Sequence, residues 1–353
     1  MYYNKVMGIQ DSIILYVRDG IVSKEFKPGQ RLKGRESFCE QFNTTPITVQ
    51  RAFNRLIERG FVTAEKSVGT FVAEKPTCLR QVAFLFTSRP GSSTWTSFSQ
   101  VVVDSIPEIE KTAGIIVKCF YGMGRNEDDS DVFKEFQKNL EEQTLVAAIY
   151  LSELRYFRKR AWADINIPYY DVAQPDKAAG QPRIELQKLE YYQKGIAKFK
   201  ELGRKRIAIV AVHIFIQERE EMVKEVFQEH GLKYYEEYVQ SFNLNKLVQP
   251  NRHFWIDRFL KLLFSLPKGE RPDGIFVTDD NFVDMTYKSL VDMGIEIGKS
   301  VDVIAHANFP AMQGMYPGLF QLGYNVPSTI ITACENLISC SDVEDIMVLP
   351  ELR

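Results

Sequence analysis

The chain has 353 residues, of which 45% are hydrophobic, and its 44 Lys and Arg nearly balance its 46 Asp and Glu. This length predicts two or three compact units with sizeable cores. The five cysteines are scattered without a Cys-x-x-Cys pair, which argues against a disulfide framework and a zinc site. Since the sequence shows neither a signal peptide nor an apolar run long enough to cross a membrane, we expect a cytoplasmic protein without membrane contact.

Charge is divided unevenly along the chain. Residues 1–76 hold twelve Lys and Arg against eight Asp and Glu, a net charge of +4, which leaves −6 for the remainder. A basic small unit joined to an acidic larger one fits a nucleic-acid-binding end and an end with another task.

Residues 28–72 carry the most informative pattern and open on a Pro-Gly turn. A helix is predicted from Pro46 to Gly60, because Thr45 suits its N-cap and apolar residues recur at helical spacing. Its expected core face consists of Val49, Ala52, Phe53 and Leu56. Two short strands around a polar tip follow within residues 61–73. Helix, turn, helix and hairpin together predict a winged helix-turn-helix.

Three segments of this region resemble the GntR family of bacterial transcription regulators. Residues 28–32 (PGQRL), 56–60 (LIERG) and 69–72 (GTFV) match family motifs in order and spacing, and the resemblance covers most of residues 9–73. It implies a DNA-binding domain over residues 1–76, with double-stranded operator DNA as its partner.

The resemblance places DNA contacts at the start of the second helix of the motif, where helix-turn-helix proteins carry their base-edge readers. The predicted set is Arg31, Arg35, Thr45, Thr48, Gln50, Arg51, Lys66 and Gly69. Gln50 could bond an adenine in bidentate fashion, whereas Arg31 and Arg35 suit phosphates. Lys66 would enter or straddle the minor groove, with Gly69 allowing the tight turn. The alternative for each is a solvated helix or wing surface. Relatives often carry a basic residue in place of Gln50, so the operator sequence does not transfer from them.

After a boundary near residues 74–77, short apolar runs alternate with helical patterns for more than 200 residues. The expected strands lie at residues 81–86, 115–120, 146–151, 207–212, 237–241, 274–278 and 301–305. The expected helices lie at residues 98–112, 131–143, 190–202, 218–230, 254–265 and 281–293. This alternation predicts an α/β domain with doubly wound parallel sheets, in which ligands bind beyond the carboxyl ends of the strands.

Residues 80–345 resemble the effector-binding domain of the LacI family, which is related to periplasmic sugar-binding proteins. The matching segments are residues 82–86, 199–208, 272–280, 294–304 and 325–328. The resemblance implies an effector domain over residues 77–353 with two lobes, three crossovers, an effector between the lobes, and a homodimer. The implied lobes are residues 80–172 with 308–325, and residues 173–307 with 326–353.

Polyol recognition uses Asp, Asn and Arg side chains in a cleft, together with an aromatic face for the sugar ring. The predicted effector-binding set is Trp95, Phe98, Gln187, Arg219, Asp280 and Asn308. Asp280 and Arg219 occupy the slots of the family's ligand carboxylate and cleft arginine. Their alternatives are a helix cap and a surface ion pair. The aromatics could equally be packing residues, and Gln187 stands where relatives often place an Asp. His306 departs from the family pattern, and we expect a structural role for it.

Enzyme motifs are missing. The four His lack metal-ligand spacing, and the sequence has neither a Gly-x-x-x-x-Gly-Lys-Ser/Thr loop nor a Gly-x-Ser-x-Gly elbow. We therefore expect no catalytic residues, no metal and no cofactor. Some GntR-type proteins carry an aminotransferase-like domain that binds pyridoxal phosphate, but that domain is longer than the region available here.

The sequence as a whole predicts a ligand-responsive transcription regulator. By family habit, a repressor of carbohydrate-utilisation genes that a small sugar-like effector releases or tunes is favoured over an activator. The alternatives that stay open are a non-sugar effector and a protein partner.

Overall fold

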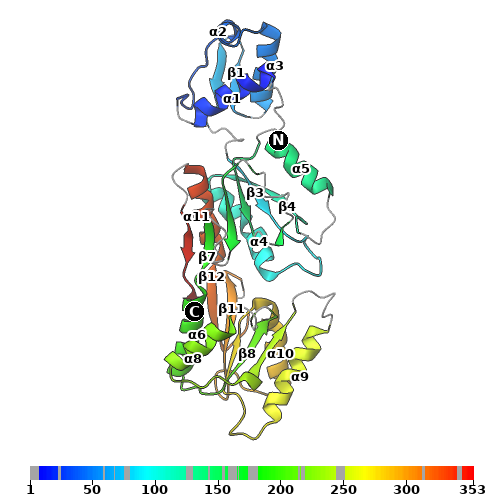
Figure 1. Cartoon of the computed structure of the whole chain (residues 1–353), viewed down its shortest axis with the longest axis vertical. Coiled ribbons are helices and arrows are strands. Elements are labelled where there is room, and N and C mark those ends of the chain that lie inside the picture. Colours follow the sequence, from blue (N-terminus) through cyan, green and yellow to red (C-terminus); the bar gives the residue numbers. More distant parts are fainter. Residues whose placement is uncertain are drawn as a thin grey trace.

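The computed structural model describes residues 8–353 except 23–24, 59, 67, 75–79, 125–129, 142–143, 153–155, 158–164, 166, 174–181, 214, 216–218, 244–250, 312–314 and 340–343. A small N-terminal domain, then lobe 1, then lobe 2 follow one another along the long axis of the molecule (Figure 1). Within these described ranges, no helix has the length and apolar character needed to cross a membrane.

The N-terminal domain is a winged helix-turn-helix, as predicted. It consists of α1 (Ile9–Val22), α2 (Arg35–Gln41), α3 (Pro46–Glu58) and an antiparallel hairpin of β1 (Val62–Glu65) and β2 (Gly69–Val72). The four expected core residues of α3 are buried among apolar side chains of α1, α2 and the hairpin. Gly60, with a φ of 68°, adopts the left-handed conformation that lets the chain leave α3.

Lobe 1 is built on a wholly parallel sheet with the strand order β13-β7-β6-β5-β3-β4. Its strands are β3 (Gln81–Leu85), β4 (Ile116–Phe120), β5 (Ala147–Tyr150), β6 (Tyr169–Ala173), β7 (Arg183–Leu186) and β13 (Ile346–Val348). α4 (Ser97–Ala113) and α11 (Val326–Ser339) cover one face, and α5 (Ser130–Glu141) covers the other. Both faces are therefore buried, which explains why β3 and β5 read as continuous apolar runs.

Lobe 2 has the strand order β14-β12-β11-β10-β8-β9, in which only the short β14 is antiparallel to its neighbour. Its strands are β8 (Ile207–Val212), β9 (Val239–Phe242), β10 (Gly274–Val277), β11 (Asp302–Phe309), β12 (Leu319–Asn325) and β14 (Glu351–Leu352). α6 (Lys188–Glu201) and α8 (Glu220–Glu229) pack on one face. α9 (Arg252–Ser265) and α10 (Val283–Asp292) pack on the other. The 3-10 turns η4 (Glu236–Tyr238) and η5 (Asp280–Phe282) complete the lobe.

The lobe boundaries differ from those implied by the sequence resemblance. β7 belongs to the lobe 1 sheet, and β12 belongs to lobe 2, where it pairs with β11 over seven positions. α11 and β13 return to lobe 1, because Val326, Ile330 and Ala333 of α11 are buried in the same core as α4. The chain does cross between the lobes three times, after β7, after β12 and between β13 and β14. Most of the expected boundary at residues 74–77 lies outside the described residues.

Gly323 of β12 is predicted to be essential for the fit of β12 against β11. A Cβ at this position would overlap the backbone carbonyl of Ala307, its partner in the ladder. We expect Gly323→Ala to lower the free energy of unfolding by about 1–3 kcal/mol or more, because backbone cannot move aside as a flexible side chain can. The control is Gly269→Ala, whose Cβ would meet nothing within 4 Å. Equal denaturation midpoints for the two variants would contradict the prediction.

Candidate DNA-binding surface and effector cleft

The start of α3 presents polar side chains of the kinds that bind DNA. The Thr48 N–H donates to Oγ1 of Thr45 over 3.4 Å, so Thr45 caps the helix as predicted. Nε2 of Gln50 donates to Oδ1 of Asn54 over 2.7 Å, which holds the Gln50 amide along the helix surface, and Arg51 beside it is exposed. Hydroxyl, amide and guanidinium groups at this end of the helix suit base edges and phosphates.

Arg31 and Gly69 lie together in the wing. Arg31 pairs with Phe71 of β2, and a Cβ on Gly69 would lie 2.7 Å from Nε of Arg31. Lys66 is exposed at the tip of the hairpin, and Arg35 is exposed as the first residue of α2. Of the predicted DNA-contacting residues, Thr48, Gln50 and Gly69 are half-buried, and the other five are exposed: Arg31, Arg35, Thr45, Arg51 and Lys66.

Sequence reasoning missed Ile47. This second residue of α3 is 67% exposed, although it is a large apolar side chain. An apolar group beside the polar residues of α3 suits contact with a thymine methyl in the major groove. The sequence did contain a signal for its exposure, because position 47 lies outside the apolar stripe of the helix.

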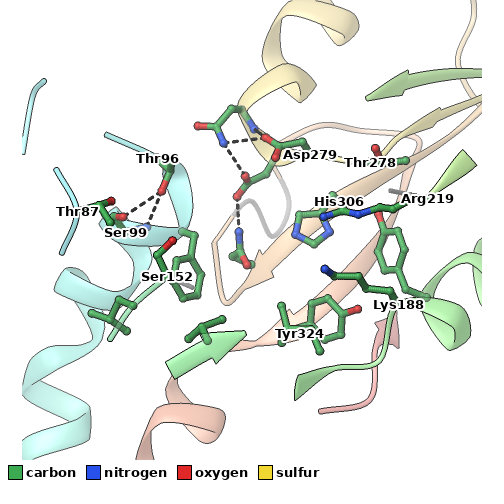
Figure 2. Close-up of a pocket in the computed structure, with 18 of the residues that line it drawn as sticks. Thr87, Thr96, Ser99, Ser152, Lys188, Arg219, Thr278, Asp279, His306 and Tyr324 are labelled. Carbon is green, nitrogen blue, oxygen red and sulfur yellow. Dashed lines mark hydrogen bonds between the residues drawn. The ribbon is translucent and has the colours of Figure 1, made fainter. Parts of the chain in front are cut away.

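A cavity of about 330 Å³ lies where lobe 1 and lobe 2 face each other. Its lobe 1 side is formed by the segment after β3, the start of α4 and the end of β5, and carries several hydroxyl groups (Figure 2). Its lobe 2 side is formed by the starts of α6 and α8 and the ends of β10, β11 and β12. The cavity therefore lies beyond the carboxyl ends of the strands, where the predicted fold class places its ligands.

Four of the six predicted effector residues line this cavity: Phe98, Arg219, Asp280 and Asn308. Trp95 and Gln187 are not among its lining residues. Trp95 packs against the ring of Phe86 with centroids 5.5 Å apart, and its Nε1 donates to Gln100. Gln187 precedes α6, and its carbonyl oxygen accepts a hydrogen bond from the Tyr324 hydroxyl. Trp95 thus has a packing role, and Gln187 lies in the connection between the lobes, so neither residue lines the cavity.

Sequence reasoning missed much of the polar lining. The additional residues are Thr87, Thr94, Thr96, Ser99, Ser152, Lys188, Tyr191, Tyr192, Thr278, Asp279, Asn281, His306 and Tyr324. His306, for which a structural role was expected, faces the cavity as well. The position of loops 87–96, 211–219 and 278–282 beyond the carboxyl ends of predicted strands was the signal available in advance, and residues of all three loops line the cavity. The starts of α6 and α4 reach the cavity through the way the lobes pack, which the local pattern does not encode.

Asp280 and Asn308 form the buried polar centre of the cavity. Asp280 is 8% exposed and Asn308 is 6% exposed, and Nδ2 of Asn308 donates to Oδ2 of Asp280 over 2.8 Å. Burial and the neighbouring Asp279 carboxylate raise the pKa of Asp280 to about 7, although the Asn308 hydrogen bond opposes the shift. Near neutral pH, Asp280 can thus offer either an acceptor or a hydroxyl donor to a ligand.

Arg219 and His306 form a second polar group next to Tyr191 and Tyr192. Burial raises the pKa of Tyr192, and hydrogen bonds with Arg219 and Thr278 oppose the shift. Burial and the Arg219 cation lower the pKa of His306 to about 4, so the imidazole is neutral at pH 7. Its ring lies 5.4 Å from that of Tyr191. Figure 2 shows Arg219, His306, Lys188 and Tyr324 on one side of the cavity, opposite the hydroxyls of lobe 1.

A direct hydrogen-bonded contact joins the two lobes at the rim of the cavity. Oδ1 of Asn281 in lobe 2 accepts from both the backbone N–H and the hydroxyl of Ser97 in lobe 1, each over 3.1 Å. Nδ2 of Asn281 donates to Asp279 over 2.8 Å and contacts Asp280 at 3.3 Å. The carboxylates of the site are thereby connected to the contact between the lobes.

Comparison with known proteins agrees with this architecture. Residues 9–72 match the family model of bacterial regulatory proteins of the gntR family, and residues 196–345 match the model of a periplasmic binding protein-like domain. No curated protein sequence matches the chain.

Solved structures of regulators resemble the part of the chain that holds the two lobes. A regulatory protein of the LacI family from Chloroflexus aggregans has a TM-score of 0.61 at 14% identity, over 78% of this chain and 96% of that chain. A LacI family transcriptional regulator from Mycobacterium smegmatis has a TM-score of 0.55 at 13% identity, over 77% and 96%. A periplasmic binding protein/LacI transcriptional regulator from Alkaliphilus metalliredigens, complexed with D-xylulofuranose, has a TM-score of 0.52 at 18% identity, over 77% and 97%.

The chain therefore carries a GntR-type helix-turn-helix domain followed by a LacI-type, periplasmic-binding-protein-like effector domain. This combination defines a DNA-binding transcription regulator rather than an enzyme.

Asp280 is predicted to make stability depend on pH. Its carboxyl stays protonated up to about pH 7 when folded but ionises near its ordinary value of 3.8 when unfolded. Between these values the folded state binds more protons, so rising pH lowers the free energy of unfolding by at most about 1.4 kcal/mol per pH unit. We expect Asp280→Asn to gain stability relative to the native chain between pH 5 and pH 8. His306 remains in both proteins, so the difference isolates Asp280.

The measurement is chemical denaturation of both proteins across that pH range. The exposed Asp292→Asn in α10 is the matched control, and its difference from the native chain should stay flat. A constant difference for Asp280→Asn would show that the carboxyl is already ionised at pH 5.

Lys66 at the wing tip is predicted to bind a phosphate or the minor groove. Removing one such contact lowers the salt slope of DNA binding by about one, because one fewer counterion is released. We expect this for Lys66→Ala and no change for Lys268→Ala, an exposed lysine of lobe 2. Fluorescence anisotropy with a labelled duplex at several salt concentrations measures the slopes. Identical slopes for Lys66→Ala and the native chain would place the wing tip away from DNA.

Proposed function

We propose that this regulator is a cytoplasmic repressor of carbohydrate-utilisation genes, released from or tuned on its operator by a small sugar-like effector bound between the lobes. The observation that carries the proposal is the buried Asp280–Asn308 pair at the centre of the cavity. A carboxyl and an amide held at fixed positions suit adjacent sugar hydroxyls, which both donate and accept hydrogen bonds.

The cavity has the dimensions and the mixed lining expected for such a ligand. Its volume of about 330 Å³ falls at the lower end of the range of small-molecule sites, which is roughly 300–1,000 Å³. The ring of Phe98 supplies an aromatic face opposite the polar residues of lobe 2. One structural relative in complex with D-xylulofuranose supports a sugar as the ligand class.

Ligand binding can be coupled to DNA binding through the contact between the lobes. Asn281 contacts Ser97 across the cleft and also contacts the carboxylates of the site, so a ligand at Asp280 and the closure of the lobes influence each other. A ligand that binds the closed state better shifts the population toward that state. In a homodimer, the change in lobe angle would alter the spacing of two winged helices and hence their fit to two half-sites.

The DNA-binding part of the proposal assigns contacts to the predicted set on α2, α3 and the wing. Thr45, Thr48, Gln50 and Arg51 would face the major groove, while Arg31, Arg35 and Lys66 would bind the backbone or the minor groove, with Gly69 shaping the wing.

The test is a thermal-shift screen against neutral sugars, sugar phosphates, sugar acids and purines, followed by titration of each hit. A true effector raises the midpoint by mass action. We expect Asp280→Ala and Arg219→Ala to weaken binding by about tenfold or more, because each removes a side chain that can form hydrogen bonds with the ligand. Asp292→Ala and Arg258→Ala, at exposed positions of lobe 2, are the matched controls.

Each outcome has a definite meaning. A hit that also changes the affinity for operator DNA supports the proposed function. Full affinity in both cleft variants would place the effector elsewhere. A screen in which no sugar or sugar derivative binds would reject the carbohydrate proposal. A purine hit would favour the alternative of a non-sugar effector.

A further inference from the structure

The effector cleft is lined by both carboxylates and cations. Asp279 and Asp280 lie at the end of β10, where the Asn281 contact joins the two lobes. Lys188 and Arg219 lie at the starts of α6 and α8, on the side where Figure 2 shows them together with Tyr324. This side, here called the cationic end, also lies within electrostatic reach of Asp279, which acts on Tyr191 and Tyr192.

The cationic end holds buried donors without an acceptor. Nε of Arg219 and the hydroxyl of Tyr191 have no hydrogen-bond partner among the described residues, and Tyr191 is only 4% exposed. The Nε–H of an arginine can only donate, and a tyrosine hydroxyl can donate too. Leaving a buried donor unpaired is destabilising, so a ligand with strong acceptors at this end would supply the missing hydrogen bonds.

Two helices begin at the same end. α6 has 14 residues and starts at Lys188, and α8 has 10 residues and starts directly after Arg219. Neither helix has a side-chain hydrogen bond that caps its first turn. Uncapped N–H groups and the positive end of the helix dipole both favour an anion. The first turns also contain Glu190, Glu220 and Glu221, but none of these carboxylates lines the cavity, so the helix starts add to the preference of the two cations inside it.

We propose that the effector is an acidic sugar derivative, whose phosphate or carboxylate binds at Lys188 and Arg219 while its hydroxyls face Asp280 and Asn308. The inference rests on the proposed function and makes its ligand class more specific. The two cations attract an anion and the Asp280–Asn308 pair suits hydroxyls, so the ligand is expected to bind in one orientation. Arg219 can form two parallel hydrogen bonds with either anion, and Lys188 adds a point charge.

The experiment is titration calorimetry with matched compounds. Hexoses and pentoses are each compared with their terminal phosphate and with their aldonate or uronate, and inorganic phosphate is titrated alone. We expect an acidic member to bind about ten- to hundredfold more tightly than its neutral parent, and more weakly as salt increases. Whichever acidic derivative binds more tightly shows whether the site prefers a phosphate or a carboxylate.

A variant tests whether Lys188 supplies the preference. We expect Lys188→Met to lose about tenfold or more in affinity for the acidic ligand and Lys188→Arg to keep most of it. Lys200→Met, an exposed position near the other end of α6, is the control for loss of a lysine from this helix. If all three variants bind the acidic ligand no more tightly than its neutral parent sugar, the inference is overturned.

The two proposals fail in different ways. Tight binding of a neutral sugar, with its acidic derivatives excluded, would overturn the acidic ligand and leave the sugar sensor intact. If neither neutral nor acidic sugars bind, both proposals are rejected.

Discussion

The site depends on a buried carboxyl at the junction of two lobes. Asp280 is almost completely covered, and it is held by Asn308 from the neighbouring strand. Removing a carboxylate from water is costly, so such a group requires hydrogen-bond partners, a changed protonation state or both. Here the pKa of Asp280 is raised, and Asn281 links its surroundings to Ser97 of the opposite lobe. Lobe closure and the state of this carboxyl are therefore physically connected.

This connection offers a physical route by which a small ligand in the cleft would change the arrangement of the two lobes. The hydrogen bonds between Asn281 and Ser97 across the cleft carry a small free energy that a ligand can match. The sheets themselves are rigid because both faces of each are covered by helices. Motion is therefore expected at the crossovers rather than within the lobes, so the lobes would move as units.

The sequence predicted elements better than it predicted their assembly. The helix that begins at Pro46 and the apolar strands β3, β8 and β10 were recognisable, because capping and apolar patterning are local properties. β12 and α11 were placed in the wrong lobes, since lobe membership depends on which sheet or core a segment joins. Asp280 and Arg219 were assigned to the cleft through the family resemblance, as its ligand carboxylate and cleft arginine, and both line the cavity. Lys188 and Tyr191 had no such signal, because a helix start faces the cavity only after both lobes have packed.

The sequence by itself determined the two-part organisation of the chain: a winged helix followed by an α/β region with alternating strands and helices. Local spacing of apolar residues, caps and glycines suffices for that, since each acts within a few residues. Only the tertiary structure decided which residues share the cleft. That set joins residues as distant in sequence as Thr87 and Tyr324. The contact between Ser97 and Asn281 beside them spans 184 positions. Burial, unpaired donors and shifted pKa values arise from such long-range packing and have no counterpart in the local pattern.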